Sequence, residues 1–179
     1  DYYERYKSGE MTNKDSIKLN DSLKYKTMIN DRTVYGGGGI MPDVFVPLDT
    51  LEYSDFYRKL SRSGVINTFT TTYADENRDQ IKENHESFAD FKENFETDED
   101  FMNKFFGYAV RENEDLTFVE EDYEISKDIL QNRLKAMIAQ NIWDFSAYYE
   151  IMNEKNEIFM RAYDVLKGNE YDLFDLTVN

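Results

Sequence analysis

The stretch YEISKDILQNRLKAMIAQNI, residues 123–142, decides the fold class of this chain. Its apolar residues recur at steps of three and four, the spacing that places side chains on one face of an α-helix. The resulting stripe consists of Leu130, Leu134, Met137 and Ile138. We therefore predict a helix over 123–142 whose apolar face is buried in a core.

The same periodicity continues beyond this helix. Asp144 can cap the next one, and Lys167 followed by Gly168 can close it, because a cation favours the last turn and glycine the position after it. The pattern predicts one continuous helix between these ends. Its apolar and aromatic residues are Phe145, Tyr148, Tyr149, Met152, Phe159, Tyr163 and Leu166.

Helix boundaries are also marked upstream. Gly64 can end a helix over 55–63, and apolar spacing predicts another helix over 65–81. Most of the upstream starts carry a residue whose side chain can accept a hydrogen bond from free backbone N–H groups. These candidate caps are Ser54, Ser87 with Asp90, and Thr97 with Asp100.

The first fifty residues carry β-like signals after a short helix over 1–10. Residues 25–35 predict a hairpin around Asn30 and Asp31, and DVFVPL (43–48) predicts another strand. The fold class is therefore mainly α. We expect a C-terminal helical domain of about five to six helices over 51–179, and a small β-hairpin or strand element near the N-terminus within 1–50.

Composition excludes several function classes. The 179 residues carry a net charge of −16, which disfavours nucleic acid and an anionic membrane surface as partners. The chain has no cysteine, so thiol catalysis and zinc–thiolate sites are excluded. No apolar run is long enough to span a membrane. The chain begins at Asp1 without a signal-peptide pattern, and we expect it to be a piece of a longer protein.

Four consecutive glycines stand before a proline and suggest phosphate binding at first sight. A Walker-type loop requires Gly-Lys-Ser/Thr at its end, whereas Ile40, Met41 and Pro42 follow here. A dinucleotide fingerprint requires spaced glycines between a strand and a helix. The run instead favours a tight backbone crossing or a strained turn, where no side chain fits.

The remaining polar groups give no catalytic or metal site. The acidic stretch from Asp98 to Asp128 lacks a calcium-loop pattern and favours a solvated face with acids in helix first turns. His85 stands among polar neighbours and is expected to be exposed and incidental, and Trp143 is expected to pack at a helix corner. No particular Ser–Lys pair stands out as a catalytic dyad. We therefore expect no cofactor, no metal and no catalytic residue.

The segment YKT…DRTVYGGGGIMPDVFVPLDT, within residues 24–50, resembles the stretch that follows the catalytic region in bacterial carboxyl-terminal processing proteases, also called tail-specific proteases. Members commonly show an arginine, a glycine-containing stretch, then Ile-x-Pro-Asp and a short strand. Here Asp31 precedes the arginine, where many members have glycine. The helices resemble, by pattern, the C-terminal region of one envelope-associated branch. The motif residues are Arg32, Gly36, Gly37, Gly38, Gly39, Ile40, Pro42 and Asp43.

The resemblance implies that this chain carries none of the catalytic residues of the protease. These serine proteases cut proteins near their C-termini with a Ser nucleophile and a Lys base, and a PDZ domain helps to engage the substrate. Those parts lie upstream of the matching segment, and no position here corresponds to them. The chain is thus expected to pack on, position or oligomerise the protease core and PDZ domain of its parent, in the bacterial cell envelope and periplasm. Its partners would include the parent's protein substrates and a second copy. The alternative is a stand-alone helical module that binds a protein partner.

Overall fold

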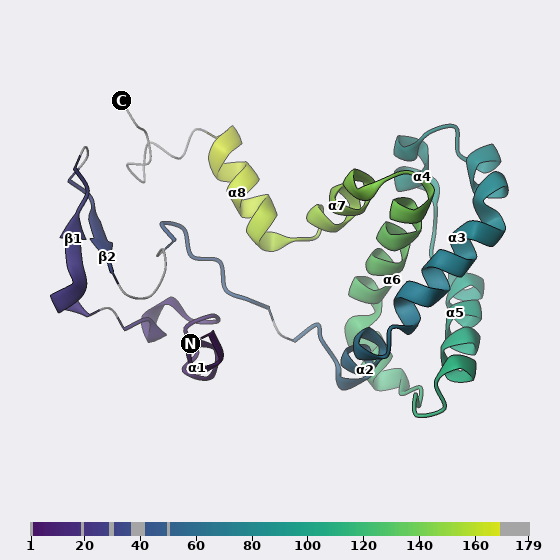
Figure 1. The fold of residues 1–179 in the computed structure, drawn as a ribbon, viewed down its shortest axis with the longest axis horizontal. Helices are drawn as coiled ribbons and strands as arrows, with labels where there is room; N and C mark the ends of the chain where they lie inside the picture. Colours follow the sequence, from purple (N-terminus) through teal and green to yellow (C-terminus); the bar gives the residue numbers. More distant parts are fainter. Residues whose placement is uncertain (1, 19, 29–30, 37–41, 50, 169–179) are drawn as a thin grey trace. The chain divides into compact units, whose positions relative to one another are not determined.

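The computed structural model describes residues 2–18, 20–28, 31–36, 42–49 and 51–168 (Figure 1). The protein is mainly helical with one small antiparallel sheet near the N-terminus, so the predicted fold class is confirmed. The chain forms two compact units. One consists of Asp1–Asp49 with Glu157–Asn179, and the other, hereafter the helical unit, consists of Thr50–Asn156.

The helical unit contains α2 (Asp55–Ser63), α3 (Val65–Asn84), α4 (Phe88–Asn94), α5 (Glu99–Glu112), α6 (Glu120–Ile142) and α7 (Phe145–Asn153). The longest helix, α6, packs against α2, α3 and α7, and α3 also contacts α2 and α5 (Figure 1). Leu130, Leu134 and Ile138 of α6 are at most 1% exposed, and Met137 is partly buried against the core. The stripe predicted for 123–142 therefore faces the core.

Capping side chains begin most helices of this unit. Gly64 ends α2 with a φ of 77°, the left-handed conformation that glycine adopts without steric cost. At α5 the predicted cap is wrong by one residue, because Asp98 rather than Thr97 accepts the Phe101 N–H, at 2.8 Å. A carboxylate is favoured there because it also interacts with the positive end of the helix dipole. The caps that confirm the prediction are Ser54, Ser87 and Asp144.

Aromatic rings fill much of the core. Phe91 and Phe105 are fully buried, and the Phe69 and Phe105 ring centroids lie 5.1 Å apart in edge-to-face geometry. Trp143 follows α6, and its ring centroid lies 5.0 Å from that of Phe91 and 5.8 Å from that of Phe88. The indole thus packs between the end of α6 and α4, which confirms the corner position predicted for it.

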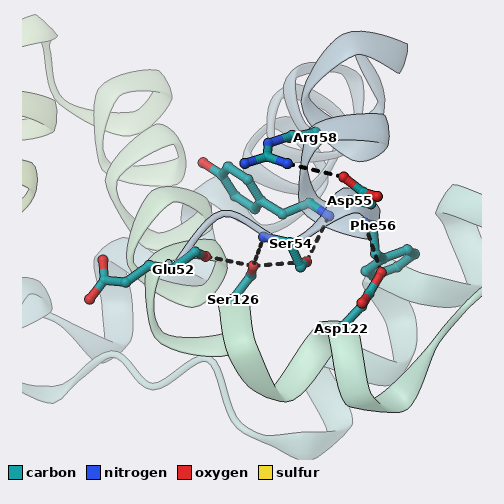
Figure 2. A network of polar contacts seen from close by, with 8 residues as sticks. Glu52, Ser54, Asp55, Phe56, Arg58, Asp122 and Ser126 are labelled. Carbon is teal, nitrogen blue, oxygen red and sulfur yellow. Dashed lines mark hydrogen bonds and ion pairs between the residues drawn. The ribbon is translucent and has the colours of Figure 1, made fainter. Parts of the chain in front are cut away.

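A buried pair of serines fastens the start of α2 to α6 (Figure 2). The Ser126 hydroxyl donates to the Glu52 carbonyl at 2.6 Å and accepts from the Ser54 N–H at 2.9 Å. The two serine hydroxyl groups are themselves hydrogen-bonded at 2.9 Å. One turn earlier in α6, the Asp122 carboxylate accepts the Phe56 N–H at 3.2 Å. The entry to the helical unit is therefore held by side chains 66–74 residues away in sequence.

The other unit carries the hairpin. Strands β1 (Lys24–Lys26) and β2 (Thr33–Tyr35) pair antiparallel, with Tyr25 opposite Val34, so the predicted hairpin is confirmed. Asp31 adopts a φ of 52°, a left-handed conformation that aspartate tolerates in turns. This unit also contains α1 (Tyr2–Lys7), α8 (Glu157–Lys167) and short 3₁₀ turns at Lys14–Ser16 and Asp21–Leu23.

The strand predicted for 43–48 is wrong, because these residues form no strand in the structure. Pro42 and Pro47 cannot donate to a ladder, and the sheet of the described residues pairs only β1 with β2. One backbone hydrogen bond is made, from the Leu48 N–H to the Met11 carbonyl at 2.9 Å. Apolar alternation alone is insufficient for a strand when no edge is available to pair with it.

The continuous helix predicted between Asp144 and Gly168 is also wrong, because it divides into α7 and α8. The break spans 154–156, where the Asn156 N–H bonds the Asn153 carbonyl at 3.2 Å. Asparagine is a weak helix former, because its side chain can hydrogen-bond nearby backbone groups, and Asn153 and Asn156 lie at this break. The described residues beyond Asp49 therefore hold seven helices, α2–α8, rather than five to six. None of the helices in the described ranges is long and apolar enough to cross a membrane.

Candidate functional site

The motif predicted around the glycine run is described in part. Arg32, Gly36, Pro42 and Asp43 are described, whereas Gly37, Gly38, Gly39 and Ile40 lie outside the described residues. The Arg32 guanidinium donates to the Asp43 carboxylate and forms an ion pair with it. The Arg32 N–H also donates to the Thr27 hydroxyl at 2.9 Å, and the Thr27 N–H donates to the Arg32 carbonyl at 2.9 Å. Arg32 thus joins the hairpin end to the segment after the glycines.

Gly36 lies where the chain leaves the hairpin. Its N–H donates to the Leu23 carbonyl at 2.8 Å. A Cβ added at Gly36 would lie 3.0 Å from Cε2 of the Tyr25 ring, which is closer than an ordinary van der Waals contact. The absence of a side chain at this position therefore allows the backbone to pass close to the neighbouring strand.

The acidic residues of 98–128 act mainly at helix starts. Glu99 and Asp100 lie in the first turn of α5, and Glu120, Glu121 and Asp122 lie in the first turn of α6, where negative charge is favourable. Within the described ranges, no three histidine, cysteine, aspartate or glutamate side chains group as metal ligands. This distribution supports the solvated, dipole-compensating role that the sequence favours.

His85 is not exposed, contrary to the prediction from its polar neighbours. Its side chain is 13% exposed, and its ring lies edge-on to Phe91 at a centroid distance of 5.4 Å. Nδ1 lies 3.6 Å from an Asp90 carboxylate oxygen and has no hydrogen-bond partner among the described residues. The hydrogen bond from Asn94, at 2.6 Å, is the main cause that lowers the pKa of Asp90. The ring fills the α3–α4 corner, which the local sequence could not indicate.

A polar cavity of about 390 Å³ lies in the helical unit, between α6, α7 and the end of α4 with the connection that follows it. Its lining includes both signs of charge. The lysines are Lys92, Lys135 and Lys155, and the acids are Glu96, Asp98, Asp128 and Glu154. None of these lysines is predicted from the sequence to be a site residue. The one signal that could have indicated Lys135 is its position beside the apolar stripe, three residues before Ile138.

Two of these lysines have opposite electrostatic surroundings. The Lys92 amine contacts the carboxylates of Glu150 at 2.8 Å and Glu154 at 2.9 Å, and hydrogen bonding to Glu150 is the largest cause that raises the pKa of Lys92. The Lys135 amine donates to the Lys92 carbonyl at 2.7 Å. Burial is the largest cause that lowers the pKa of Lys135, and Glu154 opposes it. The cavity therefore contains one well-paired cation and one partly desolvated cation.

Comparison with known proteins gives a match within the helical unit. Residues 56–144 match the model of a family of unknown function (DUF8443). The matched stretch runs from the first turn of α2 to the residue that caps α7, so it includes the α3–α6 packing and the serine pair partner Ser126. No curated protein and no solved structure matches the chain.

Proposed function

We propose that this chain is the non-catalytic C-terminal region of a tail-specific serine endopeptidase of the bacterial cell envelope. In this proposal the helical unit packs on, positions or oligomerises the protease core and PDZ domain of the same parent chain. The parent enzyme would cleave protein substrates near their C-termini. The basis is the resemblance of residues 24–50 to the segment that follows the catalytic region in that family.

The observation that carries the proposal is the pairing of the two charged residues of the motif. Arg32 and Asp43 form an ion pair that joins the residues before the glycine run to those after it. A Cβ at Gly36 would lie 3.0 Å from the Tyr25 ring, so a side chain there would require the ring to shift. These contacts support a structural role for the motif, as expected of a segment that returns to a protease core.

The buried serines of the helical unit have structural partners. The buried hydroxyl groups of Ser54 and Ser126 bond each other and the backbone. Among the described residues, no serine hydroxyl is hydrogen-bonded to a lysine amine, and the half-buried Lys135 amine donates to a carbonyl. A Ser–Lys dyad requires such contact between nucleophile and base.

The decisive experiment uses the complete reading frame. We expect it to encode a PDZ domain and a Ser–Lys protease upstream, and the purified protein to cleave an unstructured peptide near its C-terminus. Deleting 51–179 should change the turnover or the mass in solution, whereas the conservative variant Ser146→Ala should change neither. A frame that starts just before Asp1, or peptide cleavage by the 179-residue chain that depends on one of its own serines, would refute the proposal.

A stand-alone helical module that binds a protein partner is the second candidate, and one feature favours it. Phe145 and Tyr149 of α7 are 58% and 49% exposed, and their ring centroids lie 5.0 Å apart. The two rings meet edge to face, and exposed aromatic side chains are common in protein interfaces. A reading frame confined to this chain would select this candidate, and pull-down by the wild type but not by Phe145→Ala would support it.

A further inference from the structure

The cavity beside Lys135 is open and largely polar, and it has the volume of a small-molecule site. Its volume of about 390 Å³ is within the range of small-molecule pockets, about 300–1,000 Å³. Lys135 projects from α6, whose neighbouring residues Leu134 and Ala136 are fully buried. The lysine is therefore held at the cavity wall by a helix that the core fixes in place.

The charge of Lys135 is only partly compensated. Its amine donates to the Lys92 carbonyl, but among the described residues no carboxylate lies within 4.0 Å of it. The neighbouring Lys92 amine, in contrast, is paired with two glutamates. A partly buried cation is stabilised by a hydrogen-bonded anion, because burial removes the water that would otherwise solvate it. A ligand carboxylate would supply that anion.

The acids of the lining restrict which anion can bind. Three lysines face four acids, Glu96, Asp98, Asp128 and Glu154, so the lining has a formal charge of +3 − 4 = −1. A polyanion such as a phosphate ester would be repelled by this excess of carboxylates. A ligand that also carries an ammonium group would be attracted by both signs of charge. Phe95 and Ile151 add an apolar part to the lining.

We propose that this cavity binds a small zwitterion of the α-amino-acid type, with its carboxylate at Lys135, its ammonium at the lining acids and an apolar side chain against Phe95 and Ile151. The site is independent of the protease proposal, since it uses none of the motif residues. The C-terminal residue of a peptide carries the same carboxylate, but it has an amide in place of the ammonium. The two sources of a carboxylate can therefore be separated.

The test is a titration of the isotope-labelled 179-residue chain followed by backbone amide NMR. L-Leucine should give saturable shifts at 92–98, 128–135 and 151–155, with a Kd on the order of 1 mM. Leucinamide, which lacks the carboxylate, and N-acetyl-leucine, which lacks the ammonium, should each bind about tenfold more weakly or worse, the loss expected for one charged hydrogen bond. Equal binding of either analogue, or no saturable shifts with leucine, would overturn the proposal.

Variants on one helix supply the matched comparison. Lys135→Gln should weaken leucine binding about tenfold, because it removes the cation that meets the carboxylate. Lys127→Gln should leave the affinity unchanged, since Lys127 is on the same helix but outside the cavity and contacts Glu124 at 3.6 Å. Trp143 fluorescence will confirm that each variant is folded. Unchanged affinity in Lys135→Gln would refute the assigned carboxylate position.

Discussion

Replacing Ser126 by alanine would delete the hydroxyl group that joins α6 to the segment before α2 (Figure 2). This side chain is 1% exposed, and its hydroxyl contacts the Glu52 carbonyl, the Ser54 N–H and the Ser54 hydroxyl. The variant leaves the buried Ser54 N–H without its partner, at about 1–3 kcal/mol for an unsatisfied group. A second lost hydrogen bond adds about 1 kcal/mol, so we expect the free energy of unfolding of the helical unit to fall by about 2–4 kcal/mol.

Urea unfolding followed by Trp143 fluorescence measures this effect in the relevant unit. Trp143 is the only tryptophan of the chain, and its ring packs on Phe91 inside the helical unit. With a denaturant slope of about 2 kcal/mol per molar urea, the midpoint should fall by about 1–2 M. The slope itself should stay constant, because the variant exposes no additional surface in the native state.

Two further variants decide whether the network is responsible. Ser146→Ala changes an exposed serine of α7 and should leave the midpoint unchanged. Ser54→Ala removes the hydroxyl group that bonds Ser126 and that caps α2 by accepting the Tyr57 N–H. Because the two serines share a hydrogen bond, the stability loss of the double variant should be smaller than the sum of the two single losses. Strict additivity, or a Ser126→Ala midpoint equal to that of Ser146→Ala, would contradict the reasoning.

Three other predictions use the same unfolding assay. Gly64→Ala should cost about 1–2 kcal/mol, because φ is 77° there. Gly107→Ala inside α5 should instead stabilise by about 0.5–1 kcal/mol. At both positions an added Cβ would meet no atom within 4 Å beyond the adjacent residues and the helix's own backbone, so equal effects would exclude backbone strain as the cause. Asp98→Ala should cost about 1 kcal/mol through the lost cap of α5, and no loss would contradict the observed cap. For the lysines the signs differ. The raised pKa of Lys92 gives stability that is present below the ordinary lysine pKa, about 10.4, and is lost at higher pH, so Lys92→Met should lack this alkaline loss. The lowered pKa of Lys135 makes the free energy of unfolding rise as the pH approaches about 10.4 from below, so Lys135→Met should lack that rise. The same pH profile for both lysine variants would contradict the opposite pKa shifts of Lys92 and Lys135.

Local signals in the sequence predict the helical unit well. The stripe in 123–142 and the caps Ser54 and Asp144 each depend on residues within one or two helical turns, so a short window contains the needed information. The prediction is wrong where two local signals compete. Asp98 and Thr97 are both good caps, and the asparagines at 153 and 156 outweigh an apolar period that continues through them.

The contacts of the candidate sites could not be predicted because they join residues distant in sequence. The strand expected at 43–48 required a partner edge, which no neighbouring residue reveals. His85 is surrounded by polar residues in sequence, but tertiary packing brings it against Phe91 and Phe95. Arg32 and Asp43 lie on either side of the glycine run. The family resemblance identifies this segment, but it does not predict that the two side chains pair.

Lys92 and Lys135 show that net charge does not reveal which lysine lacks a direct carboxylate partner. The net charge of −16 predicts that every lysine has carboxylates nearby, and for Lys92 this holds at 2.8 and 2.9 Å. Lys135 is hydrogen-bonded to the backbone of the same Lys92 but has its carboxylates at longer range, because α6 holds it at the edge of the core. In an acidic protein, a half-buried lysine without a direct carboxylate partner is therefore more informative than the many acids around it. A ligand carboxylate, as proposed for this cavity, would supply the direct partner that Lys135 lacks among the described residues.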